Sequence, residues 1–132
     1  MEVCSCVSQH AMEHALSGYH QDLPHGAGLI MISEAYFSRW IEQHICDERF
    51  VALAKAMGNV NAKEPTDFIT ALHELMESCG VADLRMSDYD IHPEEFSQMA
   101  KDAKATMGGL FFCDRFELSD EDVIAIYENS YR

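Results

Sequence analysis

A long apolar segment near the N-terminus constrains the fold of this chain more than any other feature. Across residues 24–44, apolar side chains recur at three- and four-residue steps, the spacing of one face of an α-helix; they are Leu29, Ile32, Tyr36, Phe37, Trp40 and Ile41. Residues 27–32 are apolar almost without a break. A helix of this kind needs neighbours on several sides, so the sequence predicts a bundle packed around it.

Glycine and proline divide the rest of the chain into further helical segments. We expect helices over about residues 6–19, 47–58, 65–80, 93–109 and from 119 onward, with a loop at 81–91. Asp47 and Ser119 are expected to cap their helices, and Ser119 with Asp122 three residues later matches a capping box. We therefore predict an all-α fold, a bundle of five to six helices forming a single domain over residues 1–132.

Composition excludes several classes of function. The formal net charge is −14, whereas proteins that bind nucleic acids or anionic membranes present basic faces. The longest apolar run is too short to span a bilayer, and the N-terminus does not resemble a signal peptide. The five cysteines are odd in number and scattered, so we expect buried, reduced thiols in a cytoplasmic protein.

Three histidines are the candidates for chemistry. His10 and His14 are four residues apart and share one face of the first predicted helix. The chain then turns at residues 22–24 and places His25 at the start of the next helix, so an antiparallel return brings it toward that face. Neutral imidazole is a good ligand for iron and zinc, and the pattern predicts a metal site.

The same histidine spacing also occurs without a metal site, because surface histidines are often four residues apart. A zinc protease needs Glu directly after the first His, where this chain has Ala11, and Glu13 falls on another face of the helix. Haem ligation in a bundle is an alternative, although the chain has no haem attachment motif. His20 lies in the turn between the candidates, and three more histidines are expected at helix surfaces or caps: His44, His73 and His92.

Two motifs carry a family resemblance. VSQHAMEHALS at residues 7–17 and PHGAGL at 24–29 resemble the histidine signature of the iron-containing (group III) alcohol dehydrogenases, especially the bacterial butanol- and propanediol-type members. LRMSDYDI at 84–91 and LSDEDVIAIY at 118–127 are similar to the loop before that family's penultimate helix and to its closing helix. The resemblance implies the C-terminal domain of the dehydroquinate synthase-like/iron alcohol dehydrogenase fold.

The resemblance also implies residue roles. His10 and His25 match metal ligands, for Fe²⁺ or Zn²⁺, and His14 matches a catalytic histidine beside the substrate that helps proton movement. The complete enzyme would oxidise a small alcohol, or reduce an aldehyde, with NAD(P).

The rest of the family's machinery lies upstream of these motifs. Its other two metal ligands and its glycine-rich nucleotide-binding domain have no match here, so we expect a fragment without that domain, inactive alone and prone to homo-oligomerise. The alternative is a non-catalytic helical oligomerisation module or the remnant of a truncated gene.

Overall fold

The computed structural model describes residues 5–132, and within this range the chain is helical without any strand. The α-helices are α1 (Ser8–Tyr19), α2 (His25–Glu42), α3 (Asp47–Ala56), α4 (Asp67–Ser78), α5 (Phe96–Met107) and α6 (Asp120–Ser130). Short 3₁₀ helices are η1 (Met86–Tyr89), η2 (Pro93–Glu95) and η3 (Gly108–Cys113). The predicted all-α class is confirmed, and the six α-helices agree with the predicted five to six.

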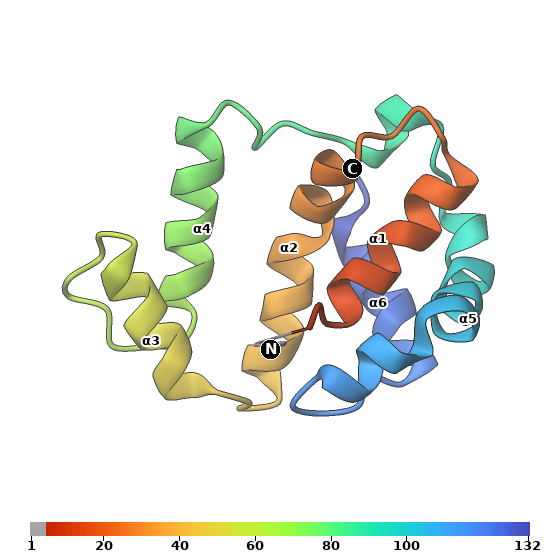
Figure 1. Cartoon of the computed structure of the whole chain (residues 1–132). Helices are drawn as coiled ribbons and strands as arrows, with labels where there is room; N and C mark the ends of the chain where they lie inside the picture. Colours follow the sequence, from red (N-terminus) through yellow and green to blue (C-terminus); the bar gives the residue numbers. More distant parts are fainter. Residues whose placement is uncertain (1–4) are drawn as a thin grey trace.

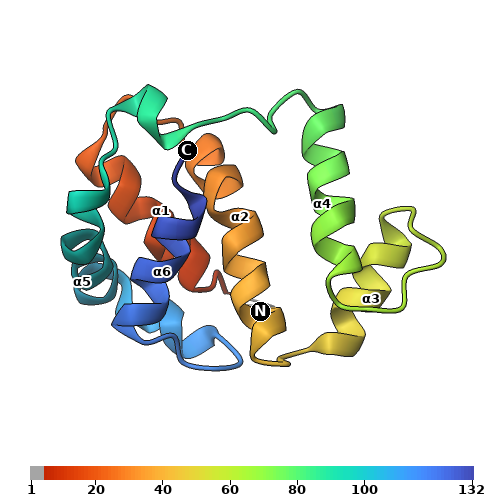
Figure 2. The ribbon, with the colours of Figure 1, turned by 180° about the vertical axis from the view of Figure 1, so that it is seen from behind.

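The long apolar helix is central, as its pattern predicts. α2 packs against α1, α4 and α6, and Figures 1 and 2 show it in the middle of the molecule from both sides. Ile32 and Tyr36 on α2 are almost completely buried. Because three neighbours cover different sides of α2, an apolar stripe wider than that of a surface helix is needed.

A buried tyrosine joins the last helix to the first in the core of the bundle. Tyr127 of α6 donates a hydrogen bond of 2.8 Å to the carbonyl of Met12 in α1, and its ring lies 5.4 Å from that of Phe96 in α5. Burial raises the pKa of Tyr127, with the Glu13 charge acting in the same direction. The phenol therefore stays a neutral donor and ties α6 to α1.

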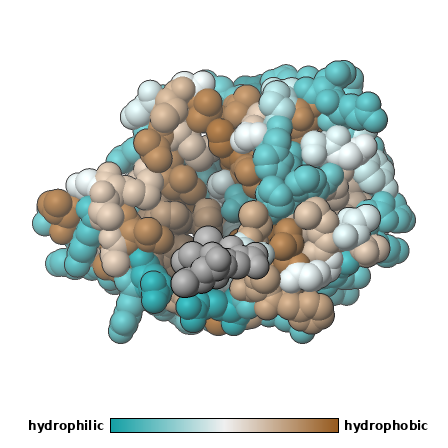
Figure 3. Space-filling view, in the orientation of Figure 1, coloured by the Kyte–Doolittle hydropathy of each residue, from teal (hydrophilic) through white to brown (hydrophobic). Residues whose placement is uncertain are grey.

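Helices α3 and α4 form an arm on one side of the bundle (Figures 1 and 2). The ring of Phe68 in α4 lies 5.3 Å from that of Phe37 in α2, and His73 Nδ1 lies 2.7 Å from Glu34 Oε1. A groove of about 680 Å³ runs between α2, α4 and α6. On the face drawn in Figure 3, apolar residues gather toward the side of this arm, and polar residues toward the opposite side.

Two local predictions need correction. Cys46, not Asp47, is the N-cap residue of α3, in a left-handed conformation with φ of 65°, so Asp47 is the first helical residue. The predicted loop at 81–91 contains η1, where Met86 is fully buried and anchors the segment to the core.

The cysteine prediction is half right. Cys6, Cys46, Cys79 and Cys113 are free, as expected, but Cys46 is only partly buried and the other three are exposed. Cysteine generally prefers protein interiors, but none of these four residues lies within an α-helix. They lie just before α1, just before α3, just after α4 and at the end of η3. Cys4 lies outside the described residues. Within residues 5–132, the helices are too short or too polar to cross a bilayer.

The cap of α6 leads to a stability prediction. Ser119 Oγ accepts a hydrogen bond from the Asp122 amide, and the Asp122 carboxylate accepts one from the Ser119 amide. Ser119→Ala should lower the free energy of unfolding by about 1 kcal/mol, because a helix-end amide loses its partner. Denaturant unfolding measures this. Ser97→Ala, at an exposed site inside α5, is the control and should cause no loss; equal effects would contradict the capping role.

Candidate metal centre

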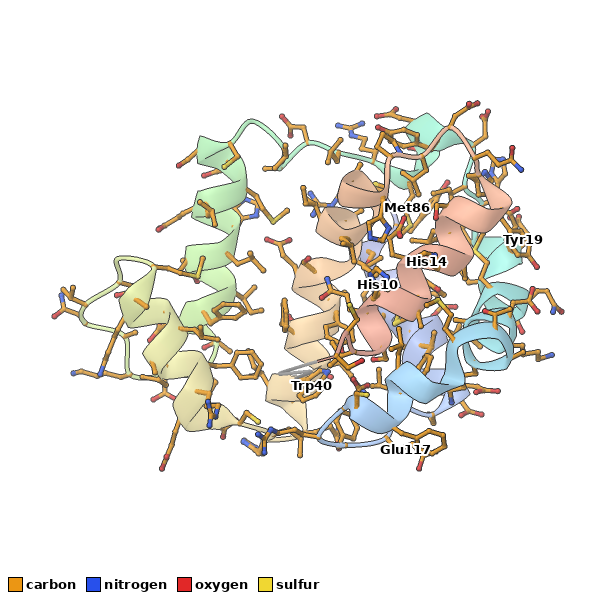
Figure 4. All side chains as sticks on the ribbon, viewed as in Figure 1. His10, His14, Tyr19, Trp40, Met86 and Glu117 are labelled. Carbon is orange, nitrogen blue, oxygen red and sulfur yellow. The ribbon has the colours of Figure 1, made fainter. Side chains whose placement is uncertain are left out.

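The candidate site lies where α1 meets the start of α2. His10 and His14 sit one turn apart on α1, on the side where it crosses α2 (Figure 4). Their Nε2 atoms are 2.9 Å apart, and their ring centroids are 4.4 Å apart. Helical spacing alone accounts for this pairing, because residues i and i+4 project from the same face.

A tight turn returns His25 to the same place. The His20 amide bonds to the Leu16 carbonyl and ends α1, and the buried Leu23 anchors the turn to the core. His25 is then the first residue of α2. Its ring centroid lies 4.8 Å from that of His10 and 5.1 Å from that of His14. The predicted convergence of the three histidines is therefore present in the structure.

The donor set suits a transition-metal ion. One nitrogen from each of His10, His14 and His25 lies within 4.8 Å of the other two. Two imidazole nitrogens bound to one tetrahedral zinc ion would lie about 3.4 Å apart, so small ring rotations would bring these nitrogens into range. His14 and His25 are exposed and His10 is half-buried, which leaves one side of the cluster open.

One residue of the site was not among the predicted candidates. Glu13 is fully buried, and its Oε2 contacts Nδ1 of His25. Helical spacing does turn Glu13 away from His10 and His14, as expected, but α2 packs on that side and carries His25 with it. The one sequence feature that hinted at this contact was Gly28, a glycine inside a helix. Only the packing of α1 against α2 shows that Gly28 makes room for the Glu13 side chain.

Comparison with known proteins places the chain in a family. The profile described as "Fe-containing alcohol dehydrogenase family, C-terminal" matches residues 1–131. The chain belongs to the iron-containing alcohol dehydrogenase family. Among curated protein sequences, none matches the chain significantly.

Solved structures show the same helical fold. An archaeal halo-thermophilic alcohol dehydrogenase from a Red Sea brine pool is 29% identical, with a TM-score of 0.81 over 92% of this chain and 32% of its own. An alcohol dehydrogenase from Oenococcus oeni is 28% identical, with a TM-score of 0.73 over 95% and 32%. A 1,3-propanediol oxidoreductase, 22% identical with a TM-score of 0.79 over 95% and 32%, shares the fold. The chain thus spans about a third of the length of these relatives.

The other described histidines of this dehydrogenase-family chain lie outside the cluster. His20 pairs with Glu95 at 3.0 Å and thereby links the α1–α2 turn to the start of α5. His44 pairs with Asp47 at 3.0 Å on the surface, and His73 with Glu34. The groove between α2, α4 and α6 shares no residue with the histidine cluster, so the cluster stands as a separate site.

The surroundings of His10 lower the pKa of its imidazole ring. Partial burial lowers its pKa below the ordinary 6.5, the neighbouring His14 and His25 lower it further, and the Glu13 charge opposes them. A lowered pKa keeps the imidazole neutral near neutral pH, the form that binds metals.

The shift predicts a pH dependence of the metal-free protein. His10 should titrate below 6.5, measured by NMR on its ring signals, and His14→Gln should move the midpoint upward by removing a neighbouring positive charge. Because the folded pKa lies below the unfolded one, the free energy of unfolding should fall as pH drops through about 6.5 toward the folded pKa. His44→Gln is the control; a His10 midpoint at or above 6.5 would contradict the shift.

Proposed function

We propose that these 132 residues form the metal-binding helical part of an NAD(P)-linked alcohol dehydrogenase. The observation that carries the proposal is the convergence of His10, His14 and His25 at the α1–α2 junction in a chain of this family. The chain spans about a third of its solved relatives, so the proposed hydride transfer belongs to a longer protein that also holds the nucleotide.

In this proposal, His10 and His25 hold Fe²⁺ or Zn²⁺. A divalent ion bound there supplies a Lewis acid that lowers the pKa of an alcohol or polarises an aldehyde carbonyl. Both imidazoles are attached to helices that pack on each other, so the protein keeps their nitrogens close before any ligand arrives. The open side of the cluster admits a small alcohol or aldehyde.

His14 is the proposed proton carrier. Its ring is exposed, and Nε2 lies 2.9 Å from Nε2 of His10. A histidine ring at that place can accept a proton on one nitrogen and release it from the other to solvent. The side chain reaches both the cluster and water, which this role requires.

Metal binding tests the proposal on the chain itself. Titration with Zn²⁺, or with Fe²⁺ without oxygen, should show weak binding at one site, followed by NMR of the histidine rings. His10→Ala and His25→Ala should each weaken binding at least about 10-fold, because each removes a ligand, whereas His44→Ala should leave it unchanged. The chain alone should not reduce NAD(P) with short alcohols; turnover at enzyme-like rates would overturn the proposed need for a separate nucleotide-binding part.

A second candidate is a non-catalytic helical oligomerisation module. Four large apolar side chains on α3, α4, η3 and the α3–α4 loop are strongly exposed; they are Leu53, Val60, Leu75 and Phe112. Exposed apolar surface of this kind favours self-association. The four described cysteines are free, which suits the reducing cytoplasm proposed for either candidate.

Self-association is a separate prediction. Light scattering of the chain should show a dimer or larger assembly at high concentration, and Leu75→Lys should shift the distribution toward the monomer by placing a charge in the contact. Lys101→Glu, a surface change on α5, is the control for charge alone. A monomer at every concentration would remove the oligomerisation candidate and leave the metal-site proposal standing.

A further inference from the structure

Glu13 is an unusual residue to find inside this bundle. Its side chain is fully buried, and apart from its contact with His25 neither carboxyl oxygen has a hydrogen-bond partner among residues 5–132. Burial of an incompletely paired carboxyl group is unfavourable. An apolar side chain of the same size would pack there at lower cost, so packing alone does not explain the presence of a glutamate.

Gly28 provides the space that Glu13 occupies. A Cβ atom at position 28 would lie 2.7 Å from Glu13 Oε1 and 2.8 Å from its Cγ, closer than real atoms approach. Gly26, two residues earlier in the same helix, has nothing within 4 Å of the corresponding position. Glycine inside a helix is also unfavourable. Two unfavourable choices, a buried carboxyl and a helical glycine, therefore meet at one point beneath His25.

His25, one of the three clustered histidines, lies against Glu13 at this point. The imidazole of His25 contacts Glu13 through Nδ1, which leaves Nε2 as its other nitrogen for binding. A histidine whose Nδ1–H donates to a carboxylate carries its lone pair on Nε2 and has a fixed ring orientation. Glu13 comes from the same helix as His10 and His14, so its contact with His25 joins the first residue of α2 to the helix that carries the other two histidines.

We propose that Glu13 is a positioning residue for the metal site: it accepts the Nδ1–H of His25 and presents Nε2 to the cluster, and Gly28 makes room for it. The inference rests on the proposed function and assigns a role to two residues outside the predicted ligand set. Glu13 touches neither metal nor substrate in this role, since it acts only through His25.

Glu13→Met separates positioning from packing. Methionine fills a similar volume without polar atoms, so the melting temperature should be unchanged or higher once the buried carboxyl is gone. The affinity for Zn²⁺ should nevertheless fall about 10- to 100-fold, the usual effect of removing such a partner. A lower melting temperature with unchanged Zn²⁺ affinity would show that Glu13 is structural and would overturn the proposal.

The variant Gly28→Ala tests the space beneath His25, and Gly26→Ala is its matched control. Both replace a glycine near the start of α2, yet only a methyl group at position 28 would displace Glu13, so only Gly28→Ala should weaken Zn²⁺ binding. In the double variant Glu13→Ala/Gly28→Ala, the second change should add nothing to the first, because the displaced group is already gone. Equal effects of the two single glycine variants, or additive effects in the double variant, would overturn the role of Gly28.

The tautomer of His25 provides a test that needs no metal. Nitrogen-15 NMR of the metal-free protein at mildly alkaline pH should show His25 as the Nδ1–H form, and Glu13→Met should shift it toward the Nε2–H form that free histidine prefers in water. An unchanged tautomer would overturn the positioning role even if Zn²⁺ binds. If wild-type protein binds no Zn²⁺ but the tautomer shifts as expected, the metal-site proposal fails while the Glu13–His25 contact stands.

Discussion

Where α1 crosses α2, the side chain of Glu13 fills the space that Gly28 leaves, and its carboxyl group contacts the first residue of α2. His10 and His14 are adjacent whatever the fold, because they belong to one helix. His25 joins them only when α2 packs at this distance and angle. A larger residue at position 28 would need the buried carboxyl group of Glu13 to move.

The rest of the bundle supports this helix pair from behind. Met12 and Leu16 of α1 and Ile32 of α2 are completely buried, and each such side chain stabilises the fold by roughly 1.5–3 kcal/mol. The hydrogen bond from Tyr127 to the Met12 carbonyl attaches the last helix to the first. The C-terminal segments therefore contribute no group to the histidine cluster but hold the helix that carries two of its members.

The histidine cluster lies at the junction of α1 and α2, where His14 and His25 are exposed. Such an arrangement keeps imidazole nitrogens ready for an ion while one side stays open to a small molecule. It also suits a site that is completed by groups from another segment of a dehydrogenase, since two or three imidazoles and solvent hold a metal less tightly than a full ligand set. The proposed metal site is therefore consistent with the membership of this chain in the iron-containing alcohol dehydrogenase family.

The sequence by itself determined the helices, the central position of α2, the capping box at Ser119 and Asp122, and the candidate histidines, because each depends on periodicity or on neighbours close in the chain. The order of residues around His10 and His25 also indicated the family. Only the tertiary structure decided that Glu13 faces His25, that Gly28 accommodates it, and that the cysteines are largely exposed. Those features depend on which side of one helix meets another, and helical periodicity does not contain the distance or angle at which two helices pack.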